Sequence, residues 1–275
     1  MKKRKEISRK VLEDLYFHEG LPLKTVAHKL GISEPTVRDR FRGHGLIPRP
    51  RGFWAVKYSK TPFDGGEQEK AYIMGFRVGD LNVYEPPGKS NVIVVRTNTT
   101  RIEQIRLMHL LFKKYGGVKV YGNGNARNIN CYLDRSFSFL LIEKPYQVES
   151  WIASKTENCL AFIAGYIDAE GNFIINQGRA RFKLDSYDEK LLHWMHEWLL
   201  SRGIKSKLRL LGRRGKARYG GGRWNNNLWR INVNEAESLH TLCQWLSPYL
   251  LHGKRIKDVR LCIKNIVERM QNGTV

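Results

Sequence analysis

The sequence of 275 residues lacks the features of a membrane protein or a secreted protein. It contains no run of 18 apolar residues, the length that a membrane-spanning helix needs. Its start, MKKRKEISRK, is not followed by an apolar stretch, so we expect no secretory signal. These absences predict a protein of the cytoplasm, or of an organelle if its gene is organellar, and not a secreted one.

Cysteine is scarce and scattered. The spacing of the four cysteines fits neither a metal site nor a compact disulfide framework, so we interpret them as reduced core residues. They are Cys131, Cys159, Cys243 and Cys262.

Acidic residues are few compared with basic ones. The sequence has 26 Asp and Glu against 48 Lys and Arg, a formal net charge of +22. No basic amphipathic helix suited to a membrane surface stands out, so this excess indicates a phosphate-rich polyanion as the partner. Residues 202–230 contain ten basic residues and no acidic one, with Tyr219, Trp224 and Trp229 among them. We interpret this stretch as a surface that follows a phosphate backbone, the alternative being a solvated basic loop.

Residues 1–50 predict a small unit of three helices. Val11, Leu12, Leu15 and Tyr16 form the apolar stripe of the first helix, and LPLKTVAHKL at 21–30 gives the second. Residues 31–33, GIS, form the turn to a third helix at 33–45, in which Ser33 is the expected N-cap.

This unit resembles a helix-turn-helix DNA-binding domain, whose third helix lies in the major groove. A three-helix unit with a purely structural role is the alternative. Residues 51–66 contain turn formers and predict a linker. The side chains of the third helix that we expect to contact DNA are Arg38, Arg40 and Arg42.

The rest of the chain contains a repeat. EKAYIMGFRVGDLNVY at 69–84 aligns with ENCLAFIAGYIDAEGNFII at 157–175. The alignment matches Gly75 with Gly165 and Asp80 with Glu170, and the two residues of each pair are 90 positions apart. Each copy continues with two strands, a helix, two strands and a final helix, which we expect at 136–144 in the first copy and 235–254 in the second. The predicted fold class is therefore α+β, with two αββαββα lobes, 67–153 and 154–275, related by a pseudo-twofold axis.

IAGYIDAEG at 163–171 resembles the signature of the LAGLIDADG homing endonucleases. IMGFRVGDL at 73–81 is a degenerate first copy, with Val78 where the family has Asp and Leu81 where it has Gly. The resemblance covers about residues 67–270. It implies a monomer that acts as a pseudo-dimer and cuts both strands of a long, asymmetric DNA target, as in intron homing.

Small residues at Gly75, Ala164 and Gly165 allow the two signature helices to approach closely. If these helices lie parallel, Asp80 and Glu170 meet near the axis, together with two negative helix ends. Because these charges repel, we expect them to bind Mg²⁺ or another hard divalent cation there.

The resemblance implies roles for three further residues. It gives Asp168 a supporting role in the helix interface. It places Lys144 and Lys254 near the scissile phosphate, where each would stabilise the transition state. An ordinary exposed lysine is the alternative for both.

The predicted strands alternate between apolar residues on one face and polar or basic residues on the other, which suits a sheet that follows the major groove. The first lobe carries less charge, with Asn128, Asn130 and Tyr132 on its last strand, so the lobes would read different half-sites. In the second lobe the side chains expected to contact DNA are Arg181, Lys183, Lys205, Lys207, Arg209, Arg230 and Asn232.

Two other functions remain open at this point. Val78 and Leu81 fit a regulator that binds DNA and has lost cleavage, although both acids survive. A maturase that binds structured intron RNA would need a similar basic surface.

Overall fold

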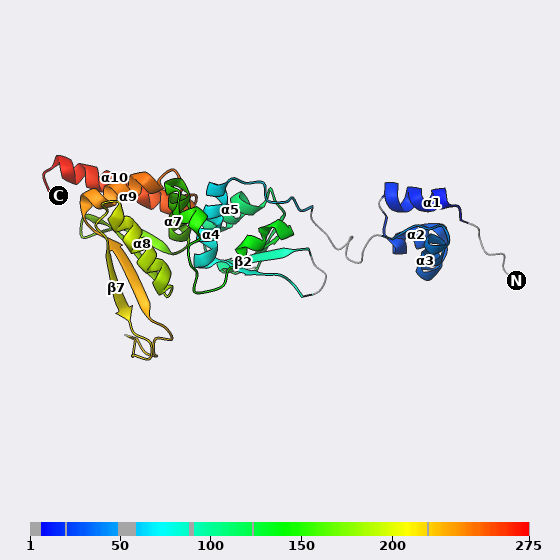
Figure 1. Ribbon diagram of the computed structural model, residues 1–275, viewed down its shortest axis with the longest axis horizontal. Coiled ribbons are helices and arrows are strands. Elements are labelled where there is room, and N and C mark those ends of the chain that lie inside the picture. Colours follow the sequence, from blue (N-terminus) through cyan, green and yellow to red (C-terminus); the bar gives the residue numbers. More distant parts are fainter. Residues whose placement is uncertain are drawn as a thin grey trace. The chain divides into compact units, whose positions relative to one another are not determined.

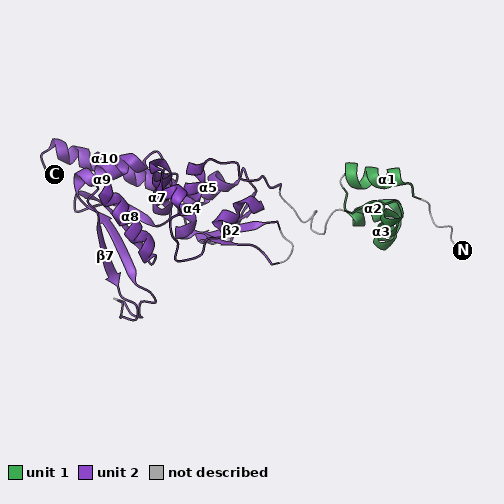
Figure 2. Cartoon of the chain, viewed as in Figure 1, with its two compact units in different colours: residues 1–57 green, residues 58–275 purple. Residues whose placement is uncertain are grey.

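The computed structural model describes residues 7–19, 21–48, 59–87, 91–122, 124–218 and 220–274. The chain forms two compact units, residues 1–57 and 58–275 (Figures 1 and 2). Two sequence predictions lie outside the described residues: most of the linker, 51–58, and Tyr219. Within the described ranges, no helix combines the length and the apolar character that crossing a membrane requires.

Unit 1 consists of short helices around a small core. They are α1 (Arg9–Glu13), which continues into the π-helical turn η1 (Asp14–His18), α2 (Leu23–Leu30) and α3 (Glu34–Gly43). Leu12 and Tyr16 are buried as expected, but Val11 is 39% exposed, which corrects the predicted stripe. Consecutive residues lie about 100° apart around a helix, so Val11 falls outside the face that Leu12 turns toward the core.

The turn between α2 and α3 follows the sequence prediction. Gly31 ends α2 in the left-handed conformation, at φ +66°. The Ser33 hydroxyl caps α3 by accepting a hydrogen bond from the Thr36 amide at 3.3 Å. Arg38 and Arg42 are exposed on α3, where they pair with Glu34 and Asp39 of the same helix.

Unit 2 contains two lobes of the same topology, as the repeat predicted. Each lobe has a four-stranded antiparallel sheet, in the orders β1-β2-β4-β3 and β5-β6-β8-β7. The first lobe comprises α4 (Glu67–Asp80), β1 (Asn82–Tyr84), β2 (Ile93–Thr99), α5 (Ile102–Phe112), β3 (Gly117–Tyr121), β4 (Arg127–Leu133) and the 3-10 helix η3 (Arg135–Leu140). After α6 (Ser150–Ala153), the second comprises α7 (Thr156–Glu170), β5 (Gly171–Asn176), β6 (Arg179–Ser186), α8 (Glu189–Ser201), β7 (Lys207–Gly212), β8 (Leu228–Val233), α9 (Ala236–Leu246) and α10 (Gly253–Gln271).

The signature helices α4 and α7 pack side by side at the junction of the lobes (Figure 1). A Cβ added to Gly75 would overlap the Phe162 carbonyl oxygen, and one added to Gly165 would overlap the Tyr72 carbonyl oxygen. Backbone therefore meets backbone at both glycines. This close packing is why each helix tolerates a mid-helix glycine despite its cost of about 1 kcal/mol.

The end of each lobe differs from the prediction. The expected helix 136–144 is the shorter 3-10 helix η3, and the expected helix 235–254 is two helices, α9 and α10, separated by residues 247–252. Pro248 lies in this break and has no amide hydrogen to continue the helix. The second of these helices, α10, was not anticipated, and it packs on β5, β6 and α5, so it contacts both lobes.

Candidate active site and nucleic-acid interface

Asp80 and Glu170 are the last residues of α4 and α7. Both side chains reach solvent, and the negative charge of Asp80 acts on Glu170. The packed helix pair therefore brings one acid from each lobe to the same end of the interface, as the sequence predicted.

The protein disfavours the ionised form of both acids. Partial removal of water raises the pKa of Asp80 to about 6, although a hydrogen bond from Thr97 acts in the opposite direction. The same effect, together with repulsion from Asp80, raises the pKa of Glu170 to about 7. The two acids therefore resist being charged together, and a cation between them would relieve this repulsion.

Asp80 is held by two side chains that sequence reasoning missed. Its Oδ2 accepts a hydrogen bond from the Thr97 hydroxyl at 3.2 Å and another from the Gln104 amide. Gln104 belongs to the buried face of α5, with Leu107 and Leu111. The sequence signal was present, since a glutamine within an apolar helical stripe needs a polar partner.

The second lobe, in the part of it that the structure describes, has no counterpart of this arrangement. Asn82 pairs with Arg96 in the first sheet and Asn172 with Lys183 in the second, which sets an offset of 87 residues from β2 onward. At this offset Leu184 and Leu191, both buried, stand where Thr97 and Gln104 stand in the first lobe. Among the described residues, no side chain donates a hydrogen bond to the Glu170 carboxylate. The two acid positions are thus chemically unequal.

Asp168 lies within the helix interface and is only 2% exposed. Its Oδ2 accepts hydrogen bonds from the Tyr72 hydroxyl of α4 at 2.6 Å, from the Leu251 amide at 2.7 Å and from the His252 amide at 2.9 Å. Burial raises the pKa of Asp168, while these three donors act in the opposite direction. The carboxylate thereby connects α4, α7 and the start of α10. Val78, also buried, occupies the corresponding position of the first signature.

Two cations lie close enough to stabilise the charged form of Glu170. The Lys144 ammonium donates to the Val78 carbonyl at 2.9 Å and lies 3.4 Å from the Asp188 carboxylate. The Arg255 guanidinium donates to the Ile167 carbonyl at 3.4 Å. The charges of Lys144 and Arg255 both lower the pKa of Glu170. Each cation therefore sits at the negative end of one signature helix.

Lys254 occupies a different place from the one expected. It lies in the first turn of α10 rather than after a helix, and its ammonium donates to Asp258 at 2.5 Å. Arg255, the next residue, shares with Lys144 a contact to a carbonyl near the end of a signature helix. No sequence pattern distinguished Arg255 from its neighbour.

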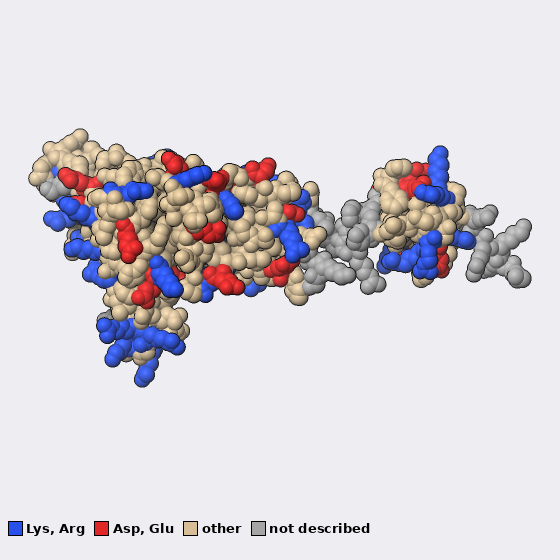
Figure 3. Space-filling model, in the orientation of Figure 1, with Lys and Arg blue, Asp and Glu red and all other residues tan. Residues whose placement is uncertain are grey.

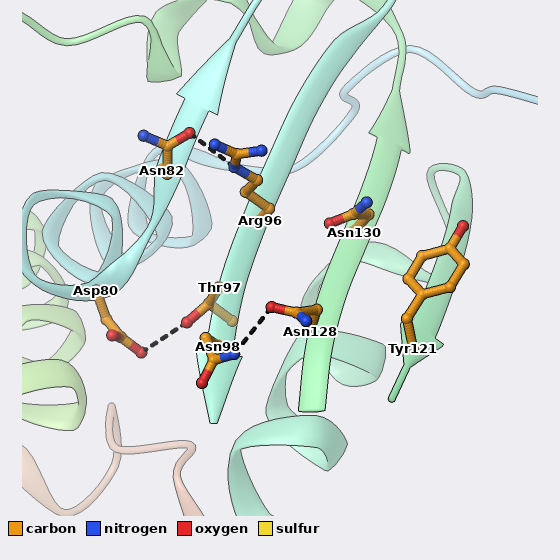
Figure 4. A pocket seen from close by; sticks show the side chains of 8 residues that line it. All are labelled: Asp80, Asn82, Arg96, Thr97, Asn98, Tyr121, Asn128 and Asn130. Atoms are coloured by element: carbon orange, nitrogen blue, oxygen red, sulfur yellow. Dashed lines mark hydrogen bonds between the residues drawn. The ribbon is translucent and has the colours of Figure 1, made fainter. Parts of the chain in front are cut away.

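A hollow of about 760 Å³ opens beside Asp80 on the first sheet (Figure 4). Hydrogen bonds fix the side chains that line this hollow. Asn98 donates to Asn128 at 2.8 Å, and Arg96 donates to Asn82 at 3.1 Å. Amide and guanidinium groups are the side chains that read adenine and guanine edges. The lining residues are Asp80, Asn82, Arg96, Thr97, Asn98, Tyr121, Asn128 and Asn130.

The second sheet is more cationic. Lys183, Asn232 and Lys207 form one row across β6, β8 and β7, on the face opposite buried residues such as Phe182 and Ile231. Arg181 and Arg209 belong to the same face by strand alternation. The predicted faces of these strands are therefore correct, but Asn232 is only 6% exposed, which corrects its prediction as an open contact residue.

In the second lobe, two of the predicted contact residues pair with acidic side chains. Arg230 donates twice to the Asp185 carboxylate, both at 2.5 Å. Lys205 precedes β7 instead of lying in the strand, and it pairs with Glu235. These acidic partners are on neighbouring segments, so alternation within one strand did not indicate them.

The acids fit a hard divalent cation. Among the described residues, no group of three or more His, Cys, Asp or Glu side chains is arranged to hold a metal ion. Asp80 and Glu170 would therefore supply carboxylate oxygens and leave the other positions to water and phosphate oxygens. Mg²⁺ binds in this way, through one or two carboxylates with several other oxygen ligands.

One of the two pseudo-symmetric lobes matches a known domain family. Residues 157–244, within the second lobe, match the LAGLIDADG-like domain family. The first lobe repeats its strand order outside the matched segment. No curated protein sequence matches the chain.

Solved structures of homing endonucleases resemble the chain at low identity. One is I-DmoI in complex with DNA and Ca, with 16% identity, a TM-score of 0.47 and coverage of 64% of this chain and 90% of that one. Another is the LAGLIDADG meganuclease I-AabMI bound to uncleaved DNA, with 13% identity, a TM-score of 0.45 and coverage of 74% and 92%.

Proposed function

We propose that this chain is a divalent-metal-dependent endonuclease of the homing type, which cuts both strands of a long, asymmetric DNA target. The observation that carries the proposal is the convergence of Asp80 and Glu170 at the ends of two tightly packed helices. Their raised pKa values supply a physical need for a cation at that point. The match of residues 157–244 to the LAGLIDADG-like domain family supports the same function.

The chain's own groups have distinct tasks in this reaction. A bound divalent cation would activate water and stabilise charge on the phosphoryl oxygens. Asp80 and Glu170 would hold such cations, and one acid per lobe would provide one site per DNA strand. Lys144 and Arg255 add positive charge beside the scissile phosphates, where negative charge develops. Asp168 keeps the helix pair in place.

The two sheets would bind the target through different chemistry. The first presents amides with one arginine, and the second presents several lysines and arginines, so their half-sites differ in sequence. Because one chain carries both lobes, a monomer completes the site. Unit 1 would add a further DNA contact through Arg38, Arg40 and Arg42 of α3.

A cleavage selection tests this function. The protein is incubated with a plasmid library carrying random inserts, with Mg²⁺ or with EDTA, and linear products are sequenced. We expect linear DNA only with Mg²⁺, and its loss in Asp80→Asn and Glu170→Gln. The matched control is Glu268→Gln, which removes one exposed carboxylate from α10. Tight DNA binding without nicks under any divalent metal would refute cleavage and favour a regulator.

A further inference from the structure

The two lobes differ most in the connection between their last two strands. In the first lobe, residues 122–126 join β3 to β4, whereas in the second, residues 213–227 join β7 to β8. We call residues 213–227 the basic tip. The β7–β8 hairpin projects away from the body of unit 2, and Lys and Arg side chains gather at its end (Figures 1 and 3).

The described part of the basic tip is an ordered structure. The Gly215 amide donates to the Trp224 carbonyl at 2.8 Å, and the Trp224 amide donates to the Lys216 carbonyl at 3.0 Å. The Trp224 ring packs against Gly212, where a Cβ would overlap it, and the Arg218 guanidinium lies 4.5 Å from the ring centre. The strand register shifts between Leu210 and Gly212, and such bulges bend and re-aim a hairpin. The tip is therefore held in a defined direction.

The cations of the basic tip have no acidic partners among the described residues. Nearer the sheet, by contrast, Arg230 pairs with Asp185 and Lys205 pairs with Glu235. Five like charges within a short hairpin repel one another, which favours a polyanionic partner. All five are exposed: Arg213, Arg214, Lys216, Arg218 and Arg223.

We propose that the basic tip binds the sugar–phosphate backbone of DNA beyond the bases that the second sheet reads. This inference rests on the proposed function. The tip continues the same two strands that carry Lys207 and Asn232, so a duplex lying on the sheet passes directly to it. Each arm adds about seven residues, which at ~3.3 Å per fully extended residue sets an upper limit of about 20 Å. At ~3.4 Å per base pair, that limit corresponds to at most about six further base pairs.

The shorter connection of the first lobe makes the extension one-sided. The protected segment of DNA should reach further from the cleavage site on the side of the second lobe. Lysine and arginine contacts to phosphate are independent of sequence, so the added base pairs should raise affinity without adding specificity.

Salt dependence tests the inference. The variant Arg213→Gln, Arg214→Gln, Lys216→Gln removes three charges but leaves the Trp224–Arg218 contact. The matched control, Lys257→Gln, Arg260→Gln, Lys264→Gln, removes three from the exposed face of α10. Binding to a random-sequence duplex is measured over a range of salt concentrations. Each phosphate contact contributes about 0.9 to the slope of log affinity against log salt, so we expect the tip variant to lose about 2 to 3 from the slope. The control should lose less than 1.

A second measurement locates the contact. Once a cleaved sequence is known, duplexes are shortened by about six base pairs on either side. Shortening on the second-lobe side should lower wild-type affinity and leave the tip variant unchanged. The inference would be overturned if the tip variant and the control lost the same amount of slope. It would also be overturned if the tip variant lost affinity for structured RNA but not for DNA. If the wild-type protein cleaves DNA and the tip variant binds DNA as tightly as the wild type, only the proposed role of the basic tip is refuted. A wild-type protein that binds no DNA refutes the proposed function.

Discussion

Replacing Gly165 by alanine should separate the two lobes at their tightest contact. The added methyl group would overlap the Tyr72 carbonyl oxygen and would lie 2.9 Å from the Phe76 amide nitrogen. Both obstacles are backbone atoms of α4, which no side-chain rotation can remove. The helices would have to move apart, and the reciprocal contact at Gly75 would loosen with them.

The expected cost follows from two opposing effects. Alanine stabilises a helix interior by about 0.5–1 kcal/mol relative to glycine. Against this, overpacking costs about 1–3 kcal/mol or more, and a gap of ~1 Å loses up to about half of the dispersion energy of the contacts that it opens. We expect a net loss of about 3 kcal/mol, equivalent to a fall of roughly 6–12 °C in the melting temperature for a unit of this size.

The assay is thermal unfolding of the full chain, followed by near-ultraviolet circular dichroism, with Gly75→Ala measured in parallel. The matched control is Gly253→Ala in the first turn of α10, where a Cβ would lie 3.7 Å from the nearest atom, a Glu103 carbon. This control should leave the melting temperature unchanged or slightly raised. If Gly165→Ala has the same melting temperature as Gly253→Ala, the backbone contact between α4 and α7 is not what joins the lobes.

Three further predictions concern the acids. Because their folded pKa values of about 6 and 7 lie above the unfolded values, Asp80 and Glu170 stabilise the fold most at acidic pH, and this contribution is lost as pH rises through 6 and 7. After discounting for solvent exposure, the loss is about 1 kcal/mol for each acid, so metal-free protein should melt lower at about pH 8 than at about pH 5. Added Mg²⁺ should reverse this fall in melting temperature, and Glu170→Gln should make the fall smaller. If the melting temperature of Glu170→Gln depends on pH as that of the wild type does, this role of Glu170 is contradicted. Gln104→Leu removes a hydrogen-bond donor to Asp80 and puts a leucine where the second lobe has Leu191. It should slow cleavage of one strand by about 10- to 100-fold, so that nicked plasmid accumulates. Equal slowing of both strands would disprove this role of Gln104. Asp168→Ala removes the acceptor of three hydrogen bonds and should cost about 3 kcal/mol or more in a denaturant titration, with Asp168→Asn costing less; a wild-type midpoint for Asp168→Ala would count against its structural role.

The repeat made the centre of the site predictable from the sequence. Gly75 and Gly165, and then Asp80 and Glu170, recur at one offset, so symmetry alone placed the acids together. The sheet faces were predictable for a similar reason, because strand alternation is strict and one face of each sheet is buried.

The missed residues depend on contacts between distant segments. Thr97 of β2 and Gln104 of α5 donate to Asp80 at the end of α4, and no residue near either of them in the chain specifies this approach. Arg255 depends on α10, whose start follows a break at Pro248 that the apolar pattern obscured. The ion pair of Asp185 with Arg230 joins two neighbouring strands, so alternation along either strand alone does not indicate it.

The hydrogen bonds to Asp168 also bear on the order in which the protein is assembled during translation. The Leu251 amide that Asp168 accepts from is 83 residues further along the chain. The ribosome therefore completes both signature helices well before the last partner of this carboxylate is available. A nascent chain halted before residue 251 would contain both Asp80 and Glu170, yet Asp168 would still lack its hydrogen bonds to the residues that lead into α10.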